Sequence, residues 1–327
     1  MKLVDIACWG LVSAAVLCSP SLLARANLAA VQGVIIDGAS AWGVPLKTGQ
    51  IVATESAVPI NVMYLLLYPE FSPFVHVGIV EVDHGDAYVY EAGGTYKLSA
   101  GAAPPTDNVS GYVRRTPLGD FLHEMGGTAS VYESPTGVDL VKVLAYAKQH
   151  TASKTPFDAY FNYTDRSRLY CSEFVAAAFE AGGKIPYATV PVKPNTSMRV
   201  VLDWLKVKDR QILPVYQLVK QERWAGTISE NYTLTELKVD RAVKAELYQR
   251  FTPDQKLGNV LAWGVGDVGL QPPIEQFRKA AFDAFDKQKN YNAAEVLQKV
   301  RQLAKSYLGE FDGGVISVCS IDFSLCH

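Results

Sequence analysis

The chain has 327 residues, of which 49% are hydrophobic and 20% charged, and its formal net charge is −2. This length and composition are typical of a globular protein with a full core, built as one large domain or two of ordinary size. The near-neutral charge, without basic runs or basic–aromatic interleaving, gives no indication of nucleic-acid binding.

The first 26 residues have the pattern of a secretory signal peptide. Lys2 supplies a weakly basic start, an apolar run follows at 6–17, and Ala24–Ala26 (ARA) fits a cleavage site. The apolar run is too short to span a membrane. We therefore expect cleavage after Ala26 and export of the mature protein, to the periplasm or the outside of the cell.

The cysteines divide into groups under this expectation. Cleavage would remove Cys8 and Cys18 and leave Cys171, Cys319 and Cys326 in an oxidising compartment. Cys319 and Cys326 are close in sequence and could pair, which would fasten the C-terminal tail and leave Cys171 as the odd thiol. A lone cysteine is ordinarily a small core residue, but the sequence around Cys171 favours a reactive one.

The first half of the chain is predicted to be rich in β-strands. Strand patterns at His76–Val82 and Ala87–Ala92 flank turn residues at 84–86 and predict a β-hairpin. Shorter strands are expected at 31–36, 51–53 and 111–115, and the apolar run 60–68 fits a buried strand or a helix.

The second half is predicted to be mainly helical. A helix is expected at 136–150, capped by Ser134 or Thr136, and another at 172–181, closed by Gly182 and Gly183. Residues 212–218 are a strand candidate, and helical periodicity with mixed charges covers 234–251, 273–289 and 292–308. The sequence thus predicts an α+β domain at 27–220 and a helical C-terminal region of unknown role at 221–327.

Three residues form a candidate catalytic constellation. Cys171 opens a predicted helix and His76 lies in an apolar strand; a thiolate is favoured by a nearby imidazolium and by a helix N-terminus. Glu91, on the partner strand of the hairpin, could accept the second imidazole N–H and orient the ring. Whether Glu91 faces His76 depends on the length of the turn, and an ordinary solvated strand residue is the alternative.

Four segments around these residues carry a resemblance to a known family. They are 48–52 (TGQIV), 76–80 (HVGIV), 89–92 (VYEA), and the pair 156–161 (PFDAYF) with 170–175 (YCSEFV). Together they resemble the permuted NlpC-type papain-like superfamily, close to its YiiX-like branch, in which the histidine strand precedes the cysteine helix. Gln50 and Phe157 depart from the usual Asp and Tyr of that family.

The resemblance implies a circularly permuted papain-like fold, in which a Cys-bearing helix packs on an antiparallel sheet. It also implies Cys171 as nucleophile, His76 as base and Glu91 as third residue, with no metal and no cofactor. Glu173 and Asp158, in the same segments, are expected to be structural.

The expected function is that of an exported thiol hydrolase that cleaves an amide bond, in a cell-wall peptide, through an acyl-enzyme. One alternative is a lipid-directed acyl hydrolase or acyltransferase, with the run 62–68 lining an acyl groove unless it belongs to the core. Another is a non-catalytic binding module that uses the C-terminal helices. The sequence leaves the bond, the acceptor and the oligomeric state open.

Two other motifs are set aside. Residues 264–269 (GVGDVG) match G-x-G-x-x-G, but Pro272 and Pro273 are expected to prevent a helix directly behind them, which a dinucleotide site needs. His123 and Glu124 lack the second histidine of a zinc-binding helix.

Overall fold

The computed structural model describes residues 34–35, 44–56, 62–96, 109–192, 202–203, 207, 211–220, 223–252, 260–263 and 268–326. The predicted signal segment 1–26 and residues 264–267 of the glycine motif lie outside these ranges. Of the predicted strand 31–36, only Val34–Ile35 is described.

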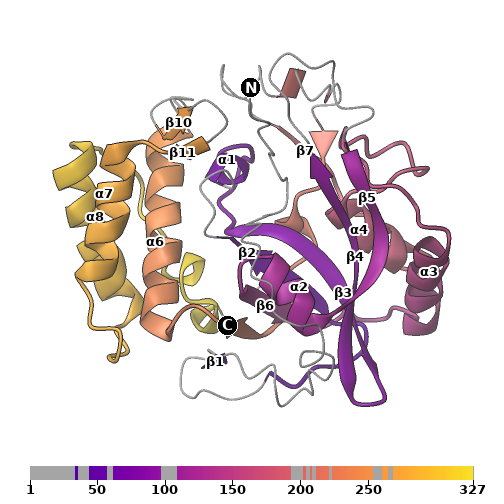
Figure 1. The fold of residues 1–327 in the computed structure, drawn as a ribbon. Coiled ribbons are helices and arrows are strands. Elements are labelled where there is room, and N and C mark those ends of the chain that lie inside the picture. Colours follow the sequence, from indigo (N-terminus) through magenta and orange to yellow (C-terminus); the bar gives the residue numbers. More distant parts are fainter. Residues whose placement is uncertain are drawn as a thin grey trace, which may run out of the picture.

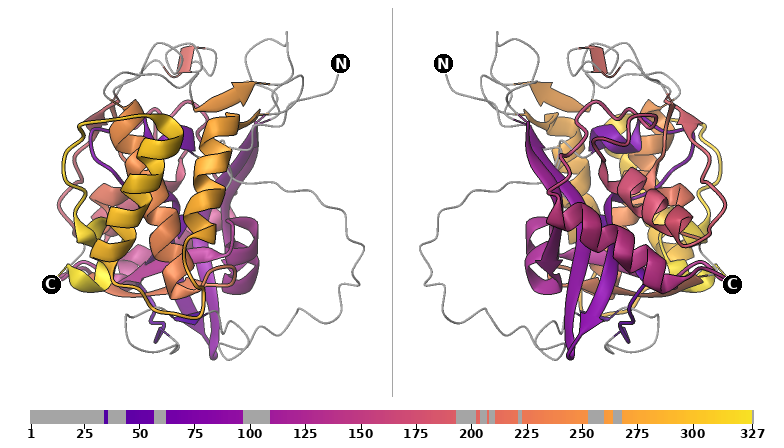
Figure 2. Two further views of the ribbon diagram at one scale, coloured as in Figure 1. Left: turned by 90° about the vertical axis from the view of Figure 1, so that its left-hand side faces the viewer. Right: turned by 90° about the vertical axis from the view of Figure 1, so that its right-hand side faces the viewer.

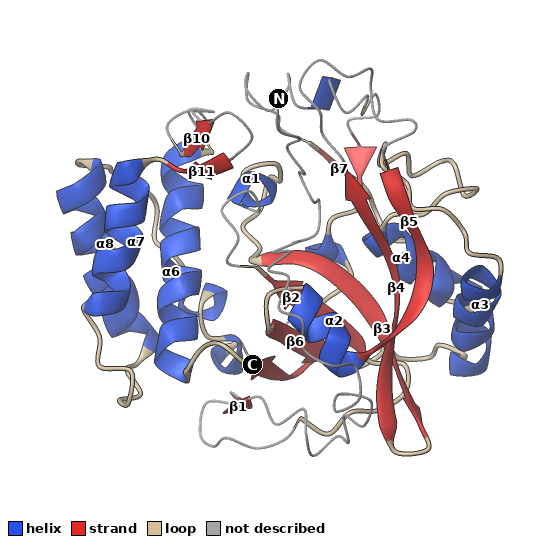
Figure 3. Ribbon diagram, viewed as in Figure 1, coloured by secondary structure: helices blue, strands red, loops and turns tan. Residues whose placement is uncertain are grey.

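An antiparallel seven-stranded sheet forms the centre of the protein, with the strand order β1-β9-β6-β2-β3-β4-β5 (Figures 1 and 3). Its strands are β1 (Val34–Ile35), β2 (Ile51–Glu55), β3 (Phe74–Asp83), β4 (Asp86–Tyr96), β5 (Val109–Pro117), β6 (Thr128–Tyr132) and β9 (Trp224–Ser229). Two small two-stranded sheets are made by β7 (Val190–Pro191) with β8 (Gln211–Ile212), and by β10 (Leu261–Trp263) with β11 (Val268–Leu270). The predicted mixture of helices with an antiparallel sheet is confirmed.

Helices cover both faces of the sheet (Figures 1 and 2). α2 (Leu118–Glu124) lies on one face of the β3–β5 part, and α3 (Leu140–Ala152) and α4 (Cys171–Ala181) lie on the other. α6 (Leu234–Phe251), α7 (Pro272–Asp283) and α8 (Ala293–Leu308) pack together beside the sheet. The remaining helical elements are α1 (Val62–Leu65) and the 3₁₀ turns η2 (Val215–Gln217), η5 (Val318–Ser320) and η6 (Phe323–Leu325).

The predicted hairpin is confirmed as β3 and β4. His84 and Gly85 both have positive φ, 51° and 90°, as a two-residue hairpin turn requires, and Asp83 pairs with Asp86 next to them. The β3–β4 ladder ends at Ile79↔Tyr90. Beyond this pair, β3 stays hydrogen-bonded to β2 as far as Phe74, and β4 stays hydrogen-bonded to β5 as far as Tyr96. β3 and β4 therefore separate from each other after Ile79↔Tyr90.

Several predicted elements differ in the structure. α3 begins at Leu140 and is capped by Asp139, whose carboxylate accepts from two helix amides, so the predicted cap at Ser134 or Thr136 is wrong. The strand expected at 212–218 is instead the end of β8 followed by η2. α7 begins at Pro272, which corrects the expectation that these prolines prevent a helix. A proline at the first position of a helix gives up no internal hydrogen bond.

The C-terminal helices pack against the sheet and share contacts with it. β9, which follows the predicted boundary at residue 220, lies between β1 and β6 in the sheet. From α6, Arg241 donates to Glu55 of β2, and both side chains are buried. One hydrophobic core runs through the sheet and these helices.

Candidate functional site

His76 and Glu91 are joined by a hydrogen bond in the interior. Nε2 of His76 lies 2.6 Å from Oε2 of Glu91, and both side chains are fully buried. If the register of the β3–β4 ladder is continued beyond Ile79↔Tyr90, His76 falls opposite Gly93. Glu91 is two residues from Gly93, so His76 and Glu91 are diagonal neighbours on the same face of the sheet. On that face the His76 ring lies 5.6 Å from the ring of Phe121 in α2.

Glu91 is held in its ionised form. Burial by itself pushes the pKa of Glu91 upward, but the hydrogen bond and charge of His76, the charge of Arg114 and the hydrogen bond from Thr116 leave the pKa below its usual value. A carboxylate can only accept, so Nε2 of His76 donates to it and Nδ1 is the imidazole nitrogen that can take up a proton.

Arg114 and Thr116 of β5 contact the carboxylate of Glu91, and the sequence analysis did not single them out. Arg114 donates from Nε to Oε1 of Glu91 at 3.0 Å, and the Thr116 hydroxyl donates to the same oxygen at 2.7 Å. Arg114 also pairs with Glu124 of α2. The only signal in the sequence was the two-residue spacing of Arg114 and Thr116, which places both on one face of a strand.

Cys171 is the first residue of α4 and is buried, with 3% of its surface exposed. The segment after β8 fixes the start of this helix, because the Ser172 hydroxyl donates to the carbonyl of Leu213 and the Leu213 amide donates to the Tyr170 hydroxyl. α4 packs against both β3 and β4, the strands that carry His76 and Glu91. The predicted helix is thus confirmed, with the thiol at its N-terminus.

Glu173 and Asp158 have structural contacts, as expected. Glu173 accepts from the Tyr170 amide at 3.4 Å and so caps its own helix, and burial raises the pKa of Glu173 to about 8. Asp158 accepts from the amides of Tyr160 and Asn162, which holds the loop before the helix.

Gln50 and Phe157, the two residues that depart from the family pattern, both have packing or hydrogen-bond contacts nearby. Gln50 is buried, accepts from the Lys47 amide and donates to the carbonyl of Pro45, so its role is structural. Phe157 is buried against Gly94, where a Cβ would lie 2.3 Å from the ring.

Cys319 and Cys326 are free thiols in this structure, so the possible pairing is not formed. Cys319 donates to the carbonyl of Leu325, and Cys326 donates to the carbonyl of Cys319. Among the described residues, no group of three His, Cys, Asp or Glu side chains is arranged to hold a metal ion. Within the same ranges, no helix is both long and apolar enough to cross a membrane.

Comparison with known proteins gives little further information. No family model and no curated protein matches the chain. Among solved structures, the chain is similar to the metalloprotein yiiX from Escherichia coli O157:H7, with a TM-score of 0.41 and 18% identity over 56% of this chain and 97% of that one. A likeness of this size assigns neither a function nor the permuted papain-like detail.

Proposed function

We propose that this protein is a thiol hydrolase in which Cys171 is the nucleophile, His76 the base and Glu91 the residue that orients His76. The observation that carries the proposal is the buried 2.6 Å hydrogen bond between His76 and an ionised Glu91. A carboxylate in this position fixes the imidazole tautomer and stabilises the imidazolium that forms when the base takes a proton.

The position of Cys171 supports the role of nucleophile. A helix N-terminus stabilises a thiolate through its unpaired amides and its dipole. The proposal requires Nδ1 of His76 to reach Sγ of Cys171, the first residue of α4, which packs against both β3 and β4. The His76 ring lies beside Phe121 of α2, and α2 and α4 lie on opposite faces of this part of the sheet (Figure 2). The proposal therefore requires the imidazole to meet the thiol beyond Ile79↔Tyr90, where β3 and β4 are no longer paired.

The proposed reaction proceeds in two half-reactions. His76 takes the proton from Sγ of Cys171, and the thiolate forms a bond to the substrate carbonyl carbon. The oxyanion is held by backbone N–H groups at the start of α4, each typically worth about 10²–10³ in rate. When the carbon–nitrogen bond breaks, His76 returns the proton to the leaving amine. Water, deprotonated by His76, then attacks the thioester and releases the acid and the free thiol.

An amide in a cell-wall peptide remains the first substrate to test, on the strength of the sequence resemblance. The lipid alternative loses one of its supports, because Leu65, Leu66 and Leu67 are buried core residues rather than the wall of an open groove. Release of an amine rather than of a fatty acid would distinguish the two substrates.

The catalytic pair is tested by iodoacetamide labelling from about pH 5 to about pH 9, with each labelled cysteine identified by peptide mass mapping. Rapid labelling of Cys171 below about pH 7 in the wild type, lost in His76→Ala, is the expected result, since an ordinary thiol has a pKa of about 8.5. His123→Ala, a histidine exposed on α2, is the matched control, and the free thiol of Cys319 provides a comparison outside the proposed pair in the same sample. Labelling of Cys171 that follows an ordinary thiol titration and ignores His76 would contradict the proposal and favour a binding module.

A further inference from the structure

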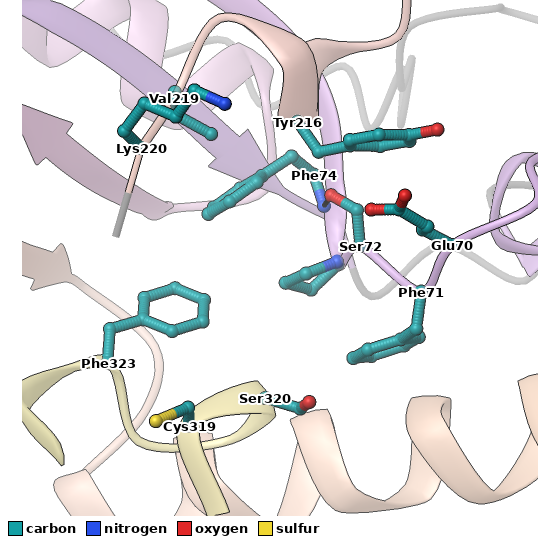
Figure 4. A pocket seen from close by; sticks show the side chains of 11 residues that line it. Glu70, Phe71, Ser72, Phe74, Tyr216, Val219, Lys220, Cys319, Ser320 and Phe323 are labelled. Atoms are coloured by element: carbon teal, nitrogen blue, oxygen red, sulfur yellow. Dashed lines mark hydrogen bonds between the residues drawn. The ribbon is translucent and has the colours of Figure 1, made fainter. Parts of the chain in front are cut away.

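A cavity of about 370 Å³ opens where the start of β3, η2 and the C-terminal tail meet (Figure 4). Four aromatic rings from these distant parts of the chain line it: Phe71, Phe74, Tyr216 and Phe323. Its volume is at the small end of the range for ligand pockets. None of the residues that line it belongs to the proposed catalytic set, although Phe74 lies two residues before His76 in β3.

The aromatic walls are fixed by packing behind them. Phe74 lies 5.6 Å from Phe323, and Phe71 lies 5.7 Å from Tyr248, measured between ring centroids. Tyr216 lies edge-on to Tyr68 at 6.0 Å. A ligand would therefore enter a cavity whose walls are already ordered, which lowers the entropic cost of binding.

The polar side chains of the lining include the exposed carboxylate of Glu70 and the hydroxyl of Tyr216, besides those of Ser72, Lys220, Cys319 and Ser320. Within the described ranges, the buried hydroxyl of Tyr216 has no hydrogen-bond partner of good geometry, although the neighbouring Gln217 side chain acts to lower its pKa. Burial and the charge of Glu70 together raise the pKa of Tyr216 to about 12, so the carboxylate lies close to this ring. Figure 4 shows the carboxylate and the hydroxyl on the same side of the cavity.

We propose that this cavity binds a small ligand through an organic ammonium group. Aromatic faces attract cations, with roughly 0.5–2 kcal/mol for each well-placed ring, and the Glu70 carboxylate adds a charge of the opposite sign. An anion would meet both the carboxylate and the negative ring faces. A purely apolar ligand would leave the Tyr216 hydroxyl buried without a hydrogen bond, which carries a free-energy cost.

Lys220 is the one basic residue in the lining. Its side chain is exposed and lies at the edge of the cavity away from Glu70 (Figure 4). Glu70 and Lys220 are both exposed, so solvent screens both charges. Because Lys220 lies at the other edge of the cavity, it opposes a cation bound beside Glu70 only weakly. Lys220→Gln should therefore leave binding unchanged or tighten it by no more than about threefold.

The test is isothermal titration of the full chain with choline and, separately, with its neutral isostere dimethylbutanol, in which carbon replaces the ammonium nitrogen. Ethanolamine, a primary ammonium, is the third probe. We expect choline or ethanolamine to bind at least about tenfold more tightly than the neutral isostere, which corresponds to about 1.4 kcal/mol. Equal binding of choline and the isostere would show a merely apolar cavity, and binding of none of the three would show no site; either result overturns the proposal.

Two variants locate the ammonium group. Glu70→Gln keeps the shape of the side chain and should weaken binding of the cationic probe by about two- to fivefold, as expected for an exposed charge, without changing the affinity for the isostere. Glu310→Gln, an exposed acid elsewhere on the surface, is the matched control and should bind as the wild type does. Ammonium binding that survives in Glu70→Gln would place the cation elsewhere and contradict the assignment. Since only binding is measured, these results do not depend on the proposed thiol chemistry.

Discussion

Arg114 of β5 donates a hydrogen bond to Glu91 of β4 at 3.0 Å, and so ties the proposed orienting residue to a permanent positive charge. The next residue, Arg115, points to the opposite face of the sheet and pairs with Glu81 and Asp83. Neighbouring arginines of one strand therefore serve different carboxylates, and they form a natural pair of test and control.

Arg114→Gln is expected to raise the pH at which the protein loses stability and Cys171 labelling on acidification. The pKa of Glu91 is lower in the folded state than in the unfolded state. The Glu91 carboxylate therefore stabilises the fold at any pH above its pKa in the unfolded state, and this stabilisation is lost as the pH falls through its pKa in the folded state. Removing Arg114 raises the folded pKa, and we expect the acid limb of both stability and Cys171 labelling to move up by about one pH unit. Arg115→Gln should leave the labelling limb in place; an equal shift in both variants would contradict a specific role for Arg114.

Glu173→Gln is expected to remove a pH dependence of stability. Burial raises the pKa of Glu173 from 4.5 to about 8. Its contribution to stability is therefore fully present below about pH 4.5 and is lost as the pH rises to about 8. Urea unfolding should show the variant gaining on the wild type across this interval, by up to a few kcal/mol, and levelling off above it. A constant difference between the two proteins, as expected for the exposed control Glu310→Gln, would show that Glu173 does not hold its proton.

Arg241→Met is expected to destabilise the junction between the C-terminal helices and the sheet. Arg241 donates from Nε to both carboxylate oxygens of Glu55 at 3.0 Å, and its guanidinium lies over the ring of Phe323. Losing one partner leaves a buried carboxylate, which typically costs about 3–5 kcal/mol. The double variant Glu55→Met with Arg241→Met should recover much of that loss in chemical denaturation.

The exposed pair Lys279–Asp283 of α7 provides the control for this experiment. Both of its side chains are largely exposed, so Lys279→Met should cost no more than about 1 kcal/mol. If Arg241→Met were no more harmful than Lys279→Met, the pair with Glu55 would not hold the helices on the sheet.

Gly94→Ala is expected to destabilise the packing of Phe157, which lies in the segment that precedes α4. A Cβ at Gly94 would lie 2.3 Å from the ring of Phe157, whereas a Cβ at Gly93 would meet nothing closer than 3.5 Å. Overpacking of this kind typically costs about 1–3 kcal/mol. Thermal unfolding should therefore show a clear loss for Gly94→Ala and a smaller one for Gly93→Ala; equal losses would mean that Phe157 moves aside freely.

The sequence predicted elements whose pattern is local. The hairpin of β3 and β4 depends on a short turn between two apolar runs, and α6 and α8 depend on apolar positions at helical spacing. α4 was predicted in the same way, with the thiol at its first turn. In each of these elements the residues that decide the structure are neighbours in the chain.

The strands β6 and β9 were not predicted, although they lie in the middle of the sheet. Both carry small hydroxyl side chains where a buried strand usually shows apolar ones. The hydroxyls of Thr128 and Ser229, and those of Ser130 and Thr227, bond each other across the two strands at 2.8 Å. Such polar residues can be buried only because the partner strand satisfies them, and that partner is distant in sequence.

For the candidate site, the sequence by itself determined which residue types are present and that His76 and Glu91 fall near one end of a hairpin. The tertiary structure decided that they face each other, because the register of the two-residue turn sets the face of every side chain that follows. It also brought Arg114 and Thr116 beside Glu91 and placed α4 against both strands. These contacts come from strand pairing and helix packing between distant segments, so the composition and periodicity of any single segment do not specify them.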